Sequence, residues 1–280
     1  MRVAKKAGLL TLLGFIALLV ALNIWGSVTL GSLSPVGETA RDTDANHTVM
    51  VFGATGSVGD GLLKAAMQDS AVTKIIVVTR RSSARIDAGV ASGRVEMRLL
   101  KDFTDYTSLG DILGEVNTVL WGLGTSSFNV DDTTFTWIHV DFPVAFVNAW
   151  LLARTDAPMS FHYVTGMGTD ARGSAHWARE KGRAEQEVAA LADGSPLRTF
   201  GYRSAFIRPT TERANFFHYA LAALLKPGGL VITSTELGEA MLEIAARPQE
   251  LPNGTIIDNV DSIAYARLYR TLNKPQRIQR

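Results

Sequence analysis

A strand, a glycine-rich turn and a helix follow one another near residue 50, and they constrain the fold more than any other part of the chain. Residues 47–52 (HTVMVF) are largely β-branched and apolar, and GATGSVG follows directly at 53–59, before a helical pattern of apolar residues. A second strand pattern, 74–79 (KIIVVT), comes after a helix-length interval. Together they predict a βαβ unit, which requires a parallel sheet.

The three glycines of this turn also predict a ligand. Glycine permits a tight turn and lets the backbone approach a pyrophosphate closely, and the N-terminus of the next helix attracts phosphate through its dipole and free amides. We therefore expect the pyrophosphate of a dinucleotide to lie against Gly53, Thr55, Gly56, Ser57, Val58 and Gly59.

Arg80 and Arg81 directly follow the second strand, at a position where an acidic residue commonly binds the free ribose hydroxyls of NAD. A guanidinium group fits a phosphate better than a diol. The sequence therefore predicts NADP(H) in preference to NAD(H), with these two arginines at the 2′-phosphate.

Strand and helix patterns alternate through the rest of the chain. Strands are expected at 95–100, 117–121, 161–165 and 206–209, and helices at 106–113, 142–153 and 178–191. This alternation predicts an α/β fold with one doubly wound parallel sheet, Rossmann-like, and no second domain. Further cofactor contacts are expected where strands end, at Asp102 on the adenine side, Gly122, Gly124 and Pro209.

The N-terminal segment lacks charged residues from 7 to 37, and residues 7–26 are long enough to cross a bilayer as a helix. A cleaved signal peptide remains an alternative, although its apolar core is usually shorter. A buried core helix is the third interpretation. The predicted organisation is an anchor or signal segment at 1–31, a linker at 32–46 and a nucleotide-binding domain at 47–280.

Orientation in the membrane is left open. Arg2, Lys5 and Lys6 precede the apolar segment, which by the positive-inside rule keeps the N-terminus in the cytoplasm and exports the domain. The glycine motif, in contrast, requires a pool of nucleotide. The sequence therefore predicts a single-pass membrane protein without deciding the side on which the domain lies.

Composition excludes several functions. Lys plus Arg number 28 against 27 for Asp plus Glu, which provides no basic field for nucleic acid. The absence of cysteine excludes disulfides, thiolate metal sites and cysteine nucleophiles. The five histidines lack the spacing of a metal site, and no metal is predicted.

The order of these motifs resembles the atypical short-chain dehydrogenase/reductase superfamily, and within it the NADPH-binding oxidoreductases related to the Tat-interacting protein. The similarity extends from about Thr48 to the C-terminal region. Besides the glycine turn and the two arginines, it is carried by Asp102-Phe103, Gly122-Leu-Gly-Thr125, the helix with Asp141, Lys181-Gly-x-x-Glu185 and Ile257-Asp-Asn259.

The resemblance also implies a catalytic site. In that superfamily a Tyr-x-x-x-Lys pair carries the chemistry, since the lysine holds the nicotinamide ribose and the tyrosine exchanges a proton with the substrate, whose oxygen a serine polarises. Lys181 matches the lysine, and Thr165 stands in the serine region. The tyrosine position holds Trp177, whose indole N–H cannot exchange a proton near neutral pH.

Two hypotheses follow from this departure. Another acid could restore hydride transfer, with His176 as first candidate and Tyr163 or Tyr202 behind it, because imidazole titrates in the useful range. No tyrosine lies within 167–186 to take over by a shift of register. Alternatively, the chain binds NADP(H) without catalysing the usual reaction, as a regulatory or scaffold protein.

The sequence therefore predicts a membrane-anchored NADP(H)-binding oxidoreductase-like protein acting on a carbonyl or enone, with Lys181, Thr165 and His176 as catalytic candidates. The substrate is not identified. By analogy, the long helices at 142–153 and 178–191 are compatible with a homodimer. The apolar residues 216–225 are expected to close over substrate or to pack into the core.

Overall fold

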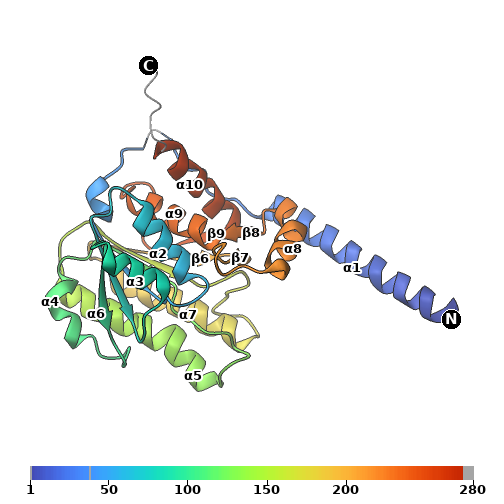
Figure 1. Ribbon diagram of the computed structural model, residues 1–280, viewed down its shortest axis with the longest axis horizontal. Helices are drawn as coiled ribbons and strands as arrows, with labels where there is room; N and C mark the ends of the chain where they lie inside the picture. Colours follow the sequence, from blue (N-terminus) through green and yellow to red (C-terminus); the bar gives the residue numbers. More distant parts are fainter. Residues whose placement is uncertain (1, 38, 274–280) are drawn as a thin grey trace, which may run out of the picture.

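The computed structural model describes residues 2–37 and 39–273. At its centre is a parallel sheet of seven strands (Figure 1), which confirms the predicted α/β architecture. In spatial order the strands are β3 (Val95–Leu99), β2 (Lys74–Thr79), β1 (Thr48–Phe52), β4 (Thr118–Trp121), β5 (Met159–Val164), β6 (Leu197–Arg203) and β9 (Thr255–Asp258). The strand order reverses between β1 and β4, and that is where a doubly wound sheet binds its ligand.

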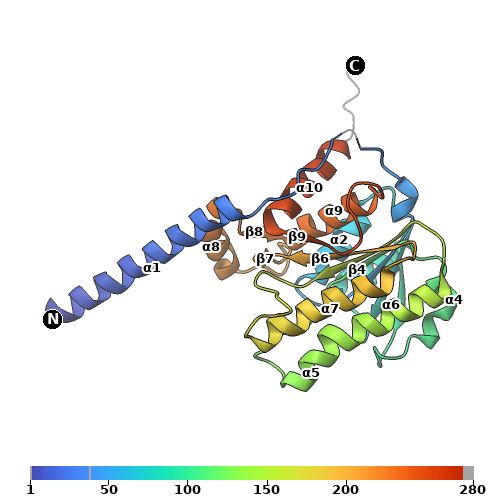
Figure 2. The ribbon, with the colours of Figure 1, turned by 180° about the vertical axis from the view of Figure 1, so that it is seen from behind.

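Helices cover both faces of this sheet, as Figures 1 and 2 show from opposite sides. One face packs against α2 (Gly59–Gln68), α9 (Ser234–Ala245) and α10 (Asn259–Leu272), with α3 (Ala84–Ala91) beside α2. The other face packs against α4 (Gly110–Leu113), α6 (Phe142–Ala153) and α7 (His176–Ala192).

β1 shows why a central strand of this sheet is apolar at nearly every position. All five of its residues are buried; Val49 and Val51 belong to the core on one face, and Met50 and Phe52 to the core on the other. A strand covered on both faces gains from a continuous apolar run, because alternate side chains enter opposite cores.

Short helical segments complete the fold. The 3-10 turns are η1 (Thr43–Asn46), η2 (Thr107–Leu109) and η4 (Lys226–Gly228), and α5 (Asp132–Thr136) continues through a π-helical turn, η3 (Trp137–Asp141), into α6. A helix was predicted over 106–113, but the chain forms only η2 and the four-residue α4 there.

The last predicted strand does not belong to the main sheet. β7 (Phe206–Arg208) pairs with β8 (Val231–Thr233) in a separate two-stranded sheet, and α8 (Phe216–Leu225) connects them together with η4. The sixth position of the main sheet is taken by β6, which the sequence reasoning missed. The predicted bounds of β2 and α6 are confirmed.

The N-terminal segment forms α1 (Arg2–Thr29), which projects away from the sheet (Figure 2). Its apolar part among residues with described side chains is Leu13–Thr29. Leu13–Thr29 is shorter than a membrane span, and among the described residues one helix, 132–153, is long and apolar enough to cross a membrane by length and composition. That helix contains α6, whose Phe146 and Trp150 are buried against the sheet, so we assign it to the core.

The chain between α1 and β1 lies along the domain through specific contacts. Gly31 N donates to Asp258 Oδ2 at 2.7 Å, and Leu33 N donates to Asp261 Oδ1 at 2.8 Å. Arg247 Nη1 donates to the carbonyl of Val36 at 2.6 Å. The predicted linker at 32–46 is therefore packed against the domain where it is described, rather than extended in solvent.

Candidate functional site

The glycine turn at the end of β1 has the geometry that its sequence predicts. Gly53 adopts φ +76°, in the left-handed region that favours glycine. A Cβ on Gly59 would lie 2.2 Å from the carbonyl oxygen of Gly53, so only glycine allows this close approach. The turn and the first residue of α2 therefore pack backbone to backbone.

Three consecutive amides of this turn have no partner within the described residues. Neither a carbonyl nor a side chain accepts a hydrogen bond from the N–H groups of Ser57, Val58 and Gly59. Val58, which precedes α2, forms no side-chain cap. Unpaired amides at a helix N-terminus are the donor set that a pyrophosphate requires, so the residues present fit a dinucleotide.

Asp60, directly after the glycine turn, joins α2 to α3 and to the loop after β7, a role that the sequence did not indicate. Its buried carboxylate accepts hydrogen bonds from Arg85 Nε at 3.0 Å and from Thr210 Oγ1 at 2.7 Å. Arg213 reaches the same region, since its Nη1 donates to the carbonyl of Thr55 at 3.1 Å. The loop after β7 thus contacts the glycine turn, a contact that no local motif indicated.

Arg80 and Arg81 line a cavity next to the glycine turn. Both line a cavity of about 240 Å³ together with Gly53, Thr55 and Phe103. Both side chains are exposed, and neither guanidinium forms an ion pair or hydrogen bond within the described part of the chain. Two unpaired guanidinium groups next to the turn are the arrangement expected for a phosphate site.

A larger cavity of about 480 Å³ continues from the same turn. Its walls come from the glycine turn, from residues 122–125 after β4 and from the segment 130–142. Phe103 and Leu123, which belong to motifs that carry the resemblance, supply apolar side chains, and so do Trp137, Ile138 and Phe142, which the sequence did not indicate as site residues. Gly122 and Gly124, the predicted cofactor contacts after β4, line it. A Cβ on Gly124 would lie 2.8 Å from the His139 ring, which explains the small residue there.

Two predicted cofactor residues have other contacts. Asp102 Oδ1 accepts hydrogen bonds from Thr104 N at 2.8 Å and Thr104 Oγ1 at 2.6 Å, which lower the pKa of this carboxyl. Its neighbour Phe103 is the residue that lines both cavities. Pro209 is buried behind β7 and lines neither of them.

Lys181 is held at the carboxyl end of the central strand β5. Its Nζ donates to the carbonyl of Thr165 at 2.5 Å, at the carboxyl end of β5. Burial lowers the pKa of Lys181 to about 8, against an opposing effect of the Glu185 carboxylate. The ammonium therefore exchanges protons close to physiological pH.

The Thr165 hydroxyl is committed to a buried acid rather than to a substrate. It donates to Glu185 Oε1 at 2.6 Å, and Arg203 Nη2 donates to Glu185 Oε2 at the same distance. This arrangement leaves the predicted polarising role of Thr165 without the hydroxyl proton that it needs.

The predicted alternative acids either have other partners or are buried in the core. His176 Nε2 lies 3.4 Å from Thr136 Oγ1 and 3.3 Å from the Asp132 carbonyl, so the ring contacts α5. Tyr163 and Tyr202 are buried in the core, and burial raises the pKa of both phenols far above neutral pH. Trp177 packs over Gly168 in the loop after β5.

His139, on the π-helical turn, lies next to Gly124 and Thr125, which line the larger cavity. Its Nε2 is 2.9 Å from the carbonyl of Thr125 and 3.2 Å from the Thr125 amide, and Tyr163 donates to the His139 carbonyl at 2.7 Å. Burial and the positive charge of Lys181 lower the pKa of His139 to about 4. The ring is therefore neutral in the folded protein near pH 7.

Comparison with known proteins identifies the architecture. No protein-family model and no curated protein sequence matches the chain. A 3-oxoacyl-[acyl-carrier protein] reductase from Brucella melitensis superposes with a TM-score of 0.60 at 14% identity, over 78% of this chain and 97% of that one. The chain has the short-chain dehydrogenase/reductase fold.

Further solved structures agree with this result. An oxidoreductase of the short-chain dehydrogenase/reductase family from Burkholderia thailandensis matches with a TM-score of 0.56 at 14% identity, over 78% of this chain and 92% of that one. The Brucella reductase in complex with NAD matches with a TM-score of 0.58 at 14% identity, over 78% and 97% of the two chains. At such identities the likeness establishes the fold, and the function rests on the site.

Within the described residues, no group of three or more His, Asp or Glu side chains is arranged to hold a metal ion. The candidate site consists of the glycine turn at residues 53–59 with its three free amides, named the nucleotide cradle below, together with Arg80, Arg81 and Lys181.

Proposed function

We propose that this chain is an NADP(H)-dependent oxidoreductase tethered to a membrane by α1. The observation that carries the proposal is the pairing of free amides at Ser57, Val58 and Gly59 with the unpaired guanidinium groups of Arg80 and Arg81. A pyrophosphate would satisfy the amides, and a 2′-phosphate would satisfy the arginines. The NAD complex of the Brucella structure supports a nicotinamide nucleotide as the ligand class.

The bound nucleotide would supply a hydride to, or accept one from, a carbonyl or enone substrate. Lys181 holds a proton at Nζ with a pKa of about 8 and is oriented by the Thr165 carbonyl. In this proposal Lys181 orients the ribose and delivers a proton. His176 remains a second candidate for proton transfer through the α5 side of the site.

A non-catalytic NADP(H)-binding protein is the second candidate, favoured by Trp177 at the tyrosine position and by the commitment of Thr165 to Glu185. The variant Trp177→Tyr separates the two, because it recreates Tyr-x-x-x-Lys. A silent wild type that gains carbonyl reduction in Trp177→Tyr supports the non-catalytic candidate. Turnover in the wild type that is lost in Lys181→Met supports the oxidoreductase.

Membrane attachment rests on α1, whose described side chains are apolar and exposed over most of Leu13–Thr29. Exposing apolar side chains along a helix that leaves the domain raises the free energy in water, whereas contact with lipid lowers it. Extraction of native membranes with alkaline carbonate tests this part. A chain released into the supernatant would exclude a spanning α1.

Cofactor choice is tested by thermal unfolding of the purified chain with NADPH or NADH. A ligand at about 100 times its dissociation constant stabilises by about 2.7 kcal/mol. We expect NADPH to stabilise more than NADH, and Arg80→Gln and Arg81→Gln each to reduce the difference. Arg172→Gln, an exposed arginine away from the glycine turn, serves as control. Equal responses to both nucleotides in the wild type would refute the role of the two arginines.

A further inference from the structure

α8 exposes an apolar surface that the domain does not cover. Its ten residues, FFHYALAALL, include no Asp, Glu, Lys or Arg. Phe216 and Phe217 are each 78% exposed, and Tyr219, Leu221 and Leu224 are also exposed. A surface helix ordinarily presents charged residues to water, and a contiguous exposed apolar patch marks an interaction surface.

This surface adjoins the end of α1. Asn23 Nδ2 donates to the carbonyl of Leu224 at 3.0 Å, and its Oδ1 accepts from the Gly228 amide at 2.6 Å (Figure 1 shows the two helices side by side). If α1 spans a bilayer through residue 26, Asn23 lies about 4.5 Å inside that end at a rise of 1.5 Å per residue. Interfacial helices bury their apolar side chains about 5–10 Å deep, which is the level α8 would occupy.

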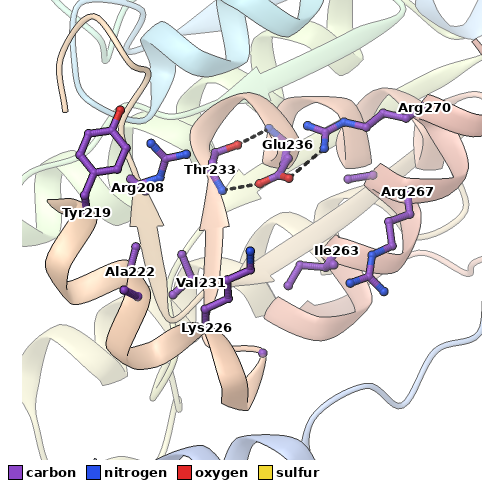
Figure 3. A pocket seen from close by; sticks show the side chains of 13 residues that line it. Arg208, Tyr219, Ala222, Lys226, Val231, Thr233, Glu236, Ile263, Arg267 and Arg270 are labelled. Atoms are coloured by element: carbon purple, nitrogen blue, oxygen red, sulfur yellow. Dashed lines mark hydrogen bonds and ion pairs between the residues drawn. The ribbon is translucent and has the colours of Figure 1, made fainter. Parts of the chain in front are cut away.

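A cationic cavity of about 430 Å³ lies next to α8, between β7, β8 and α10 (Figure 3). Arg208, Lys226 and Arg267 line it, and none of these three side chains has a carboxylate partner within the described residues. The acid in its wall, Glu236, is already paired with Arg270 at 2.9 Å. The cavity therefore carries an excess of positive charge.

One of these cations has a donor that no acceptor of the described residues satisfies. Arg208 Nη1 is buried without any hydrogen-bond partner, and its guanidinium lies over the Tyr219 ring at 4.7 Å. A buried donor without a partner destabilises a fold unless a ligand satisfies it. Three cationic groups around one space favour an anion with several oxygens, and phosphate is the match.

We propose that this cavity holds the phosphate of an anionic membrane phospholipid, whose acyl chains lie over the apolar side of α8. The inference rests on the membrane anchor of the proposed function. A cationic cavity and an uncharged aromatic helix side by side match the head and the tails of one lipid. A soluble phosphate ester would use the cavity and leave Phe216 and Phe217 in water.

The test uses the full chain in mild detergent and measures its thermal stabilisation by three probes. Dioctanoyl phosphatidylglycerol has both phosphate and acyl chains, dioctanoylglycerol has the chains alone, and glycerol phosphate has the phosphate alone. We expect saturable stabilisation by the first and at least tenfold weaker binding of the other two. Lys226→Gln and Arg267→Gln should each weaken phosphatidylglycerol about tenfold, because a charge-assisted contact is lost. Arg172→Gln should bind as the wild type does.

Two results would overturn the proposal. Equal binding of dioctanoylglycerol would show that the phosphate is not recognised, and equal binding of glycerol phosphate would assign the cavity to a soluble anion. Amide hydrogen exchange of residues 216–225 in phosphatidylglycerol nanodiscs adds a second readout, since protection is expected there and should fall in Phe216→Ser. NADPH stabilisation is measured on the same samples, so a failure of lipid binding is distinguished from a failure of the nucleotide site.

Discussion

Replacing Lys181 with methionine tests the electrostatics of the site through folding alone. The lysine pKa is near 10.5 in the unfolded chain and about 8 in the folded one, because burial disfavours the charge. At about 1.4 kcal/mol for each factor of ten, charging Lys181 in the folded state costs about 3 kcal/mol. This cost is present in full below pH 8 and is relieved as the pH rises toward 10.5.

The sign follows from proton binding. Between pH 8 and 10.5 the unfolded state binds more protons than the folded state, so the free energy of unfolding of the wild type rises with pH by up to about 1.4 kcal/mol per pH unit. Lys181→Met has a neutral side chain in both states and lacks this contribution. The two stability curves should therefore differ in slope over this range, while the contributions of the other titrating groups are the same in both proteins.

The assay is urea unfolding of the nucleotide-free chain at several pH values, followed by tryptophan fluorescence. Lys101→Met is the control, since Lys101 is exposed and has no ion pair or hydrogen bond within the described residues. Wild type and Lys181→Met curves that stay parallel from pH 8 to 10 would refute the lowered pKa and the use of Lys181 as a proton donor near neutrality.

Three further predictions concern the cradle and its supports. Gly59→Ala should cost about 1–3 kcal/mol and abolish nucleotide stabilisation, since its Cβ would meet the Gly53 carbonyl, whereas Gly110→Ala, with open space around it, should be near neutral. His139→Gln should lose less stability than the wild type between pH 6.5 and 4 in acid titration, because protons bind His139 more weakly in the folded state. Glu185→Ala should reduce the free energy of unfolding in urea by about 3–5 kcal/mol, because it leaves the partly buried Arg203 without its partner. The control Glu187→Ala, at a surface residue, should reduce it by about 1 kcal/mol or less.

Local sequence patterns were sufficient to predict an element where residues close together in the sequence determine its structure. The run at 74–79 and the helix at 142–153 have the predicted bounds, since each is a continuous apolar segment with clear ends. β6 was missed because its sequence, LRTFGYR, contains arginine and glycine at positions that look unsuited to a buried strand. In the structure Arg198 lies over Phe200 and donates to carbonyls of residues 245 and 247.

The candidate site likewise contains residues that local patterns predict and residues that only the tertiary structure reveals. The glycine turn was predictable because strand, turn and helix are contiguous, and Arg80 and Arg81 because they follow the next strand. The commitment of Thr165 to Glu185 was not predictable, because α7 and β6 bring the acid and its Arg203 partner to β5 from elsewhere in the chain. Sequence spacing predicts which residues lie near a site, but tertiary packing determines which partner a hydroxyl group such as that of Thr165 bonds to.

The short loop between β7 and α8 lies between the proposed lipid site and the glycine turn. Thr210 and Arg213 contact Asp60 and Thr55 at the nucleotide cradle, and Phe216 begins the exposed helix only a few residues later. If lipid bound at α8 changes how this loop rests on the cradle, it changes nucleotide affinity by some factor. Linkage then requires nucleotide to change lipid affinity by the same factor, so each ligand would report the presence of the other.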